Sequence, residues 1–426
     1  MKNFNELGLS NSLLKKLSEM DFREPSEIQR KAIPPILAGK DVIAGSATGS
    51  GKTLVFGAAI VDRLKKGHGL QALILTPTRE LAEQVSTSLN EFSKYAPLEI
   101  IPVYGGVSIN LQIKQLRTAD VVVGTPGRIL DHLSRGTIDL KHIKILVLDE
   151  ADRMLDMGFL PAVENILQEC PEKRQTILLS ATVYEDLSSL AERYMINPAH
   201  VSAESQVDPS KLRQVYYDVP SKMKFSLLVY LLKKEQANLL MVFCNTRINA
   251  DFVGKNLKYS GIDAVAIHGG LAQNRRKNIM WNFHKGKVCV LVCTDVAARG
   301  LDIPNVTHIY NYDLPKTSKE YIHRIGRTAR AGKEGIAVNL VSQRDYENFG
   351  RILSDYSLDI AEEKLPNMPP VKVQLFDRRG GHDRNERGFS REGGAQGNRP
   401  GRYKRPNKSG GFGRSGPSRS FRKVYK

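Results

Sequence analysis

Short runs of β-branched and other apolar residues recur along the chain, with helix-like stretches between them. In the first half these runs are Val42–Ala44, Ala72–Leu75, Val121–Val123, Ile145–Leu148 and Ile177–Leu179, and in the second half they are Leu239–Phe243, Ala264–Ile267, Val288–Val292, Thr307–Tyr310 and Ile336–Val341. Continuous rather than alternating apolar runs are typical of parallel strands that helices cover on both faces. The pattern predicts an α/β protein with two domains, each a parallel sheet with helices on both faces.

The composition of the chain predicts where these domains end. A polar stretch near Ser202–Lys211 reads as a linker, so we expect a first domain over 1–205 and a second over 206–365. Pro366–Pro370 should stop regular structure, and Gly, Arg, Ser, Asn and Pro dominate from Arg378 onward. Such a segment buries too little apolar area to offset its ordering entropy. We therefore expect residues 366–426 to be a disordered tail.

Charge gives that tail a candidate role. The chain carries a net charge of +18, and residues 378–426 hold 15 Lys/Arg against 3 Asp/Glu, which is +12 of that total. Arg378–Gly381, Arg387–Phe389 and Gly410–Arg414 look like an RGG-type sequence, in which arginine pairs with phosphates and stacks on bases beside interspersed aromatic rings. We expect the tail to add affinity for RNA; an inert solubilising linker is the alternative.

No apolar run approaches the ~20 residues of a membrane span. Met1–Ser10 lacks the pattern of a signal peptide, so we expect a cytoplasmic protein with no membrane partner. The four cysteines, Cys170, Cys244, Cys289 and Cys293, form no C-x-x-C pair. A metal site or disulfide framework built on them is not expected, and Cys289 and Cys293 should pack as small hydrophobic residues.

A glycine-rich octapeptide follows the first predicted strand and precedes an apolar helix, as a P-loop requires. Its residues are Ser46, Ala47, Thr48, Gly49, Ser50, Gly51, Lys52 and Thr53. The glycines let backbone N–H groups face phosphate oxygens, at the positive end of the helix dipole. Lys52 should contact the β- and γ-phosphates, and Thr53 should offer its hydroxyl to Mg²⁺.

Two further groups complete a candidate site for ATP hydrolysis. Asp149-Glu150-Ala151-Asp152 ends a predicted strand, where Asp149 suits a Mg²⁺ ligand and Glu150 suits the base that deprotonates water. In His323–Arg330, three arginines at spacing three should share one face of a helix. Arg327 and Arg330 suit arginine fingers that reach the γ-phosphate, and a solvated basic helix is the alternative.

With these elements, the chain strongly resembles the DEAD-box RNA helicases of superfamily 2 from about Phe4 to Leu365. The ordered motifs of the first half are Phe22–Gln29, Pro77–Ala82, Gly105–Gly106, Thr125–Arg128, Asp149–Asp152 and Ser180–Thr182. The motifs of the second half are Val242–Asn245, His268–Gly269 with Gln273 and Arg276, Thr294–Asp295, Ala298–Asp302 and His323–Arg330. The resemblance implies two tandem RecA-like domains and an ATP-dependent RNA helicase that closes on ATP and RNA.

The resemblance also implies roles for single residues. Gln29 would read the adenine edge and Phe22 would stack on its ring, while Gly300 and Asp302 would line the ribose site. The expected RNA contacts are Arg79, Gly105, Gly106, Thr125 and Arg128 in the first domain and Arg276 and Thr294 in the second. Ser180 and Thr182 would couple the acidic box to domain closure through Asp152 and His323. The expected cofactors are ATP and Mg²⁺, the expected partner is RNA without sequence preference, and the core should be monomeric.

Two residues depart from the family's usual pattern: Ser46 stands where alanine is usual, and Asp21 where glycine commonly precedes Phe22. Two other functions stay open at this stage. One is an ATP-gated clamp that holds RNA with slow turnover, and the other is a DNA helicase. The sequence identifies neither the physiological RNA and its pathway nor protein partners, the oligomeric state in cells or a role in cold stress.

Overall fold

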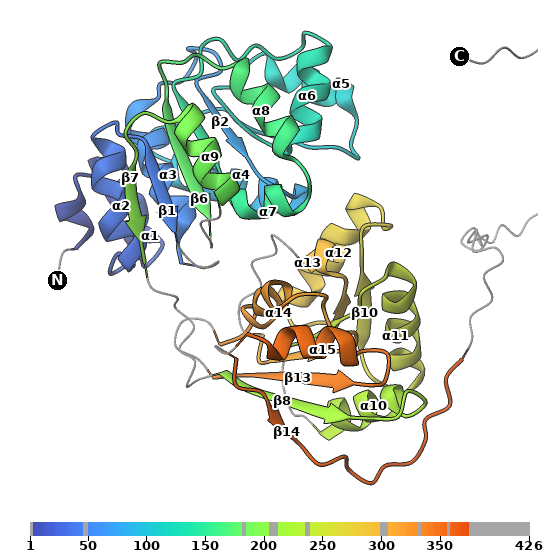
Figure 1. Ribbon diagram of the computed structural model, residues 1–426. Helices are drawn as coiled ribbons and strands as arrows, with labels where there is room; N and C mark the ends of the chain where they lie inside the picture. Colours follow the sequence, from blue (N-terminus) through green and yellow to red (C-terminus); the bar gives the residue numbers. More distant parts are fainter. Residues whose placement is uncertain are drawn as a thin grey trace, which may run out of the picture. The chain divides into compact units, whose positions relative to one another are not determined.

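The computed structural model describes residues 3–45, 50–180, 185–203, 212–234, 239–298, 306–329, 334–355 and 358–374 (Figure 1). Within these residues the chain forms two sheets, one from each predicted domain. Each sheet has seven described strands, and every pair of neighbouring strands is parallel. The predicted fold class is confirmed.

The first sheet has the strand order β3-β4-β2-β5-β6-β1-β7. Its strands are β1 (Val42–Gly45), β2 (Ala72–Leu75), β3 (Ile100–Val103), β4 (Val121–Gly124), β5 (Ile145–Leu148), β6 (Gln175–Ser180) and β7 (Ala199–Ser202). Its helices are the 3-10 helix η1 (Phe4–Leu7) and the α-helices α1 (Asn11–Glu19), α2 (Glu27–Leu37), α3 (Lys52–Arg63), α4 (Arg79–Phe92), α5 (Ile109–Leu116), α6 (Pro126–Ser134), α7 (Ala151–Asp156), α8 (Leu160–Gln168) and α9 (Glu185–Tyr194).

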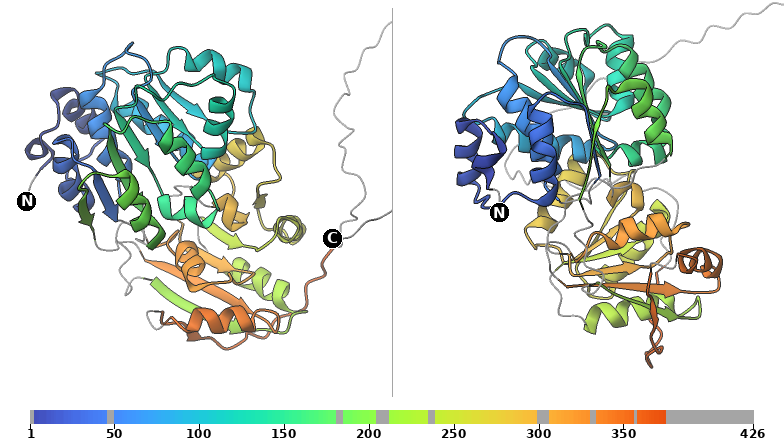
Figure 2. Two further views of the ribbon diagram at one scale, coloured as in Figure 1. Left: turned by 45° about the horizontal axis from the view of Figure 1, so that its top comes forward. Right: turned by 60° about the vertical axis from the view of Figure 1, so that its left-hand side comes forward.

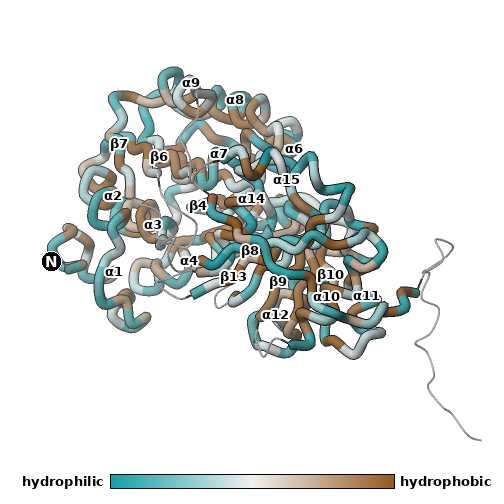
Figure 3. Tube along the Cα trace, turned by 60° about the horizontal axis from the view of Figure 1, so that its bottom comes forward, coloured by the Kyte–Doolittle hydropathy of each residue, from teal (hydrophilic) through white to brown (hydrophobic). Residues whose placement is uncertain are grey.

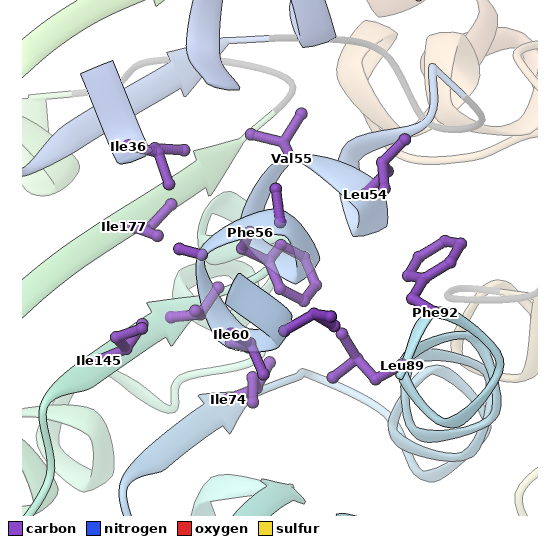
Figure 4. Close-up of a cluster of buried hydrophobic side chains, with 14 of the residues drawn as sticks. Ile36, Leu54, Val55, Phe56, Ile60, Ile74, Leu89, Phe92, Ile145 and Ile177 are labelled. Atoms are coloured by element: carbon purple, nitrogen blue, oxygen red, sulfur yellow. The ribbon is translucent and has the colours of Figure 1, made fainter. Parts of the chain in front are cut away.

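Helices cover both faces of this sheet, as the right-hand view of Figure 2 shows. Successive strand residues point to opposite faces, so Ile145 packs with α1–α4 whereas Leu146 packs with α6–α9. On the first face, α3 lies between the strands and α4, where Phe56 is fully buried (Figure 4). The two apolar layers hold the strand ends at fixed positions.

The second sheet has the order β10-β11-β9-β12-β13-β8-β14. Its strands are β8 (Leu212–Asp218), β9 (Leu240–Phe243), β10 (Ala264–Ile267), β11 (Val290–Cys293), β12 (His308–Asn311), β13 (Gly335–Val341) and β14 (Ala361–Glu362). Its helices are α10 (Lys224–Lys234), α11 (Arg247–Tyr259), α12 (Gln273–His284), α13 (Asp295–Ala298), α14 (Ser318–Ile325) and α15 (Tyr346–Leu353). Helices α10 and α11 pack on one face, and α12–α15 pack on the other.

Hydrophilic and hydrophobic stretches alternate along the helices in Figure 3. This alternation is expected of helices that cover an apolar sheet with one side and face water with the other. Among the described helices, none is both long enough and apolar enough to cross a bilayer.

The apolar runs did not predict all the strands. β3, β7, β8 and β14 were missed; β3 contains Pro102, and polar residues interrupt β7 and β8. These strands lie at or next to the sheet edges, where one side of a strand is less buried. The expectation for Cys289 was wrong, because it is exposed whereas Cys293 is buried.

The start of the tail also differs from the prediction, because residues 366–374 pack on the second domain. Met368 is buried against the apolar layer of α10 and α11. The Val371 N–H donates to Ser226 Oγ at 2.9 Å, and the Gln374 N–H donates to Asn256 Oδ1 at 2.7 Å. The segment has no helix or strand beyond Glu362, as the prolines predict, but side chains of the domain bind its backbone. Residues 375–426, which hold the basic sequence, lie outside the described residues.

Candidate functional site

The motifs of the first domain follow the carboxyl ends of its strands. Because the strands are parallel, these ends share one edge of the sheet. Backbone hydrogen bonds extend this alignment beyond the strands: Thr125 N–H donates to Val103 O at 3.0 Å, and Asp149 N–H donates to Leu75 O at 2.9 Å. The edge therefore brings together the described end of the P-loop from Ser50, the acidic box and Ser180, the buried last residue of β6.

The end of the P-loop is tied to the start of α2. Gly51 has φ +87°, and helix α3 begins at the next residue, Lys52. Ser26 Oγ donates to the Ser50 carbonyl at 2.8 Å, and Gln29 Nε2 donates to the Gly51 carbonyl at 3.1 Å. A Cβ at Gly51 would displace that Gln29 amide, and the φ angle by itself favours glycine.

Gln29 also accepts a hydrogen bond from the Ser26 backbone N–H at 2.8 Å, which completes a capping box on α2. A glutamine amide has two N–H donors and two acceptor lone pairs, and these two contacts use one of each. One N–H donor and one acceptor lone pair remain. The edge of adenine would need both, because its N7 accepts a hydrogen bond and its N6 amino group donates one. The nucleotide and P-loop roles of Gln29 are thus compatible.

Phe22, the other predicted adenine contact, is half-buried and packs edge-to-face with Phe4, with ring centroids 6.3 Å apart. Asp21 precedes it with φ +57° and ends α1. The Phe22 N–H donates to Leu17 O at 3.0 Å, and the Asp21 N–H donates to Ser18 O at 3.1 Å. These bonds form a Schellman motif, whose left-handed position favours glycine.

Asp149 and Glu150 are buried just beyond β5, at 3% and 6% exposure. Burial raises the pKa of Asp149 to about 7, against the opposing effect of the Lys52 charge. Asp149 Oδ1 is buried and has no hydrogen-bond partner among the described residues. Glu150 has φ +53°, and its carboxylate forms a 2.7 Å ion pair with Arg153, which is itself buried.

The predicted RNA contacts of the first domain converge on the loop after β3. The Arg79 guanidinium lies against Gly106, where φ is +85° and a Cβ would collide with it. Arg128 Nε donates to Tyr104 O at 3.2 Å and Arg128 Nη2 donates to Val107 O at 2.6 Å, so Arg128 holds both ends of the loop. Thr125 precedes Pro126, the first residue of α6, so the positive end of that helix dipole faces the same edge.

Two residues that support this loop were not predicted. Gln112 Nε2 donates to Tyr104 O at 3.1 Å, and Gln112 Oε1 lies 3.2 Å from Nε2 of the fully buried His132. Burial, together with the charge of Arg128, lowers the pKa of His132. The sequence signal was weak: these are single polar residues on amphipathic helices.

Arg324 organises the matching edge of the second sheet. It is 1% exposed and pairs in two places with Asp295: Nε to Oδ1 at 2.6 Å and Nη2 to Oδ2 at 2.7 Å. It also donates hydrogen bonds to the side chains of Asn245 (2.8 Å) and Asn311 (3.1 Å) and to the Asp313 carbonyl (2.5 Å). The Asn311 amide in turn donates to Asn339 Oδ1 at 2.8 Å. Polar residues inside apolar strands could have signalled this network.

The prediction that Arg324 and Arg327 share one helical face was wrong, and Arg330 lies outside the described residues. Helix α14 ends at Ile325, and Ala329 has φ +54°, so the chain has left the helix before Arg327. Arg327 is buried, at 3% exposure.

Other predicted site residues lie on separate elements. Thr294 follows β11 and its carbonyl accepts the N–H groups of Ala297 and Ala298, while Arg276 lies on α12. His323 is on α14, and Asp152 is on α7, where its Oδ1 accepts the Arg153 N–H at 3.0 Å. Thr53 is the second residue of α3. The predicted residues that lie outside the described ones are Ser46, Ala47, Thr48, Gly49, Thr182, Gly300, Asp302 and Arg330.

Comparisons with known proteins agree with this arrangement. The DEAD/DEAH box helicase family model matches residues 26–190, and the helicase conserved C-terminal domain model matches residues 223–332. The chain is 44% identical over 348 residues to the DEAD-box ATP-dependent RNA helicase CshA of Bacillus cereus, covering 81% of this chain and 66% of that protein. It is 44% identical over 380 residues to ATP-dependent RNA helicase CshA of Listeria monocytogenes, covering 88% of this chain and 72% of that protein.

Solved structures match across both domains. The structure of Saccharomyces cerevisiae Dbp5 bound to RNA and ADP BeF3 aligns with a TM-score of 0.77 at 33% identity, over 85% of this chain and 96% of that one. Mss116p bound to single-stranded RNA and AMP-PNP aligns with a TM-score of 0.75 at 27% identity, over 86% and 80%. The tandem RecA-like architecture that the motifs implied is confirmed, and the chain belongs to the DEAD-box helicase family.

Proposed function

We propose that this protein is an ATP-dependent RNA helicase that hydrolyses ATP when RNA induces closure of its two domains. The observation that carries the proposal is the buried Asp149 carboxylate, whose Oδ1 has no partner among the described residues and which lies in the field of Lys52. A buried acidic oxygen without a partner is costly unless a ligand satisfies it. Its place beside a P-loop makes a phosphate-bound cation the fitting ligand.

The donor set fits Mg²⁺, a hard cation that prefers oxygen ligands and retains several waters. Asp149 and the Thr53 hydroxyl would hold it, directly or through water. Bound there, Mg²⁺ would neutralise charge on the β- and γ-phosphates. Lys52 would hold the same phosphates from the first turn of α3.

The remaining ATP contacts divide between the domains. Gln29 would bind the adenine edge with its remaining donor and lone pair, and Phe22 would stack on the ring. Gly300 and Asp302 would line the ribose site. Arg327 and Arg330 would reach the γ-phosphate from the second domain after closure, so the site would be complete only in the closed state. Ser180, Thr182, Asp152 and His323 would couple closure to the acidic box.

Glu150 would act as the base that takes a proton from the attacking water. Its ion pair with Arg153 at 2.7 Å occupies the carboxylate in the described state. For Glu150 to accept a proton, that pair has to loosen. Closure on RNA is the step that would rearrange this charge cluster, so hydrolysis would depend on RNA.

RNA would bind by its backbone rather than by base sequence. Arg79, the Gly105–Gly106 turn, Thr125 and Arg128 would contact phosphates or hydroxyls in the first domain. Arg276 and Thr294 would do so in the second. Closure would bend one strand and expel its partner locally, which would unwind short duplexes or remodel RNA–protein complexes. The added RNA affinity of the tail, the monomeric core and the cytoplasmic location stay predictions.

The proposal is tested by measuring ATP hydrolysis with and without single-stranded RNA. We expect weak basal hydrolysis and strong stimulation by RNA, and less stimulation by DNA. Glu150→Gln should keep both ligands bound and hold RNA longer with ATP, because the amide cannot accept the proton. An equal rate of ATP hydrolysis without RNA would contradict a site divided between the two domains. In the wild type, a closed state that lasts longer than strand displacement takes would favour the RNA clamp.

A further inference from the structure

Helix α12 carries the chain's single tryptophan, Trp281, on its surface. The side chain is 54% exposed, whereas Ile279, Met280 and Phe283 of the same helix are buried against the sheet. Helix α12 therefore packs on the sheet through other residues, and the exposure of Trp281 does not come from an unpacked helix. Single exposed apolar side chains are common, so exposure alone marks no site, but tryptophan is enriched at binding interfaces.

The ring is held by a cation. Lys287 Nζ lies 4.7 Å from the ring centroid of Trp281, within the range of a cation–π interaction. This contact orients the indole and places a positive charge at its face. More than half of the side chain remains exposed with the lysine in place.

The surrounding chain is strongly basic. Residues 264–294 contain Arg275, Arg276, Lys277, Lys285 and Lys287 and no aspartate or glutamate, and of these Arg276 and Lys277 form ion pairs with Glu80 and Glu83. Arg275, Lys285 and Lys287 are exposed. Aromatic rings set among positive charges are how proteins bind single-stranded nucleic acid without sequence preference, by stacking on a base while cations contact its phosphates.

We infer that Trp281 and Lys287 form a stacking site for one base of single-stranded RNA on the second domain. This inference rests on the proposed RNA-dependent function and adds a base contact to a set of backbone contacts. The base stacks on the exposed indole, Lys287 holds the indole, and Lys285 and Lys287 neutralise the neighbouring phosphates. The site takes any base, because every base presents a π face.

The single tryptophan makes a direct test possible in the full-length protein. A single-stranded oligouridine RNA is titrated while two signals are recorded: the anisotropy of a label on the RNA and the intrinsic emission of Trp281. We expect the emission to change and to saturate together with the anisotropy. A rise in anisotropy without any change in emission would overturn the stacking site and leave the proposed function intact. Absence of RNA binding in the anisotropy would count against the proposed function itself.

Variants separate stacking from a general surface effect. Trp281→Ala should weaken RNA binding about five-fold or more, since stacking is worth ~1–3 kcal/mol per base, and Trp281→Phe should lose less. Tyr259→Ala is the matched control, because Tyr259 is 64% exposed on α11, which packs on the opposite face of the same sheet. Equal affinities for wild type and Trp281→Ala, or equal losses for Trp281→Ala and Tyr259→Ala, would overturn the inference and point to a surface for a protein partner.

Discussion

Both sheets end in buried charged side chains, but the two edges satisfy these charges differently. In the first domain, Asp149 has an oxygen without a described partner, and burial raises its pKa to about 7. In the second domain, the Arg324 guanidinium contacts Asp295, Asn245, Asn311 and the Asp313 carbonyl. Asp149 keeps unmet bonding capacity, whereas Arg324 uses its bonding capacity within the fold. We therefore infer that Asp149 is placed to meet a bound ligand, whereas Arg324 holds together strand ends of its own domain.

The strongest test of this comparison is Asp149→Asn. The variant should lose ATP hydrolysis by on the order of 10³-fold, because the cation that neutralises the phosphates loses its carboxylate. Its stability should change by less than about 1 kcal/mol, since no described protein partner of Oδ1 is lost. Steady-state hydrolysis and chemical denaturation measure the two effects. A large loss of stability would mean that Asp149 is part of the scaffold.

Arg324→Ala should give the opposite result, with a loss of stability of about 3–5 kcal/mol in the second domain. The buried guanidinium and its hydrogen bonds are lost, and the half-buried Asp295 loses its ion-pair partner. Emission of Trp281 in α12 reports unfolding of that domain during urea denaturation. The exposed Arg275→Ala on α12 is the control and should change stability by less than about 0.5 kcal/mol. A loss below about 1 kcal/mol for Arg324→Ala would remove the distinction between the two edges.

A third change separates RNA binding from ATP binding within the first edge. Gly106→Ala should strain the loop by about 1–3 kcal/mol, because φ is +85° and the new Cβ would collide with Arg79. Affinity for RNA should fall, and affinity for ATP should not. Gly136→Ala is the control, because φ is +63° there but no atom lies within 4 Å of the added Cβ. Equal RNA affinities for the two variants would show that the Arg79 contact is unimportant.

The smallest expected effect is a gain. Asp21→Gly should stabilise the first domain by up to about 1 kcal/mol, because Asp21 occupies the left-handed position that ends α1. RNA-stimulated ATP hydrolysis should stay unchanged if Asp21 affects only the turn between α1 and Phe22. Thermal denaturation and the hydrolysis rate measure both. A changed KM for ATP would instead connect this turn to adenine binding.

Sequence motifs pointed to the residues around Asp149 more readily than to the Arg324 network. Lys52, Asp149 and Glu150 belong to short motifs whose spacing along the chain is local, so their chemistry could be recognised before the fold was known. The Arg324 network joins α14 to β12, to β13 and to Asn245 in the loop after β9, and only the fold brings these residues together. The same limit explains why Arg327 was placed on a helix: spacing alone does not show that α14 ends at Ile325.

The strands show a related limit. Central strands such as β5 are buried on both faces and read as continuous apolar runs. β7 alternates between half-buried and exposed positions, and β8 carries Arg213 and Gln214, so neither produces such a run. Edge and near-edge strands are defined by their neighbours more than by their own residues.

The segment that follows β14 has a practical consequence for shortening the protein. Removing the chain after Leu365 would uncover the apolar surface that Met368 covers on α10 and α11. It would also deprive the Ser226 hydroxyl and the Asn256 amide of backbone partners. An exposed apolar surface of that kind favours aggregation. A truncated protein made to measure what the basic sequence contributes should therefore retain Gln374, so that any loss of RNA binding reports on the removed residues and not on a damaged second domain.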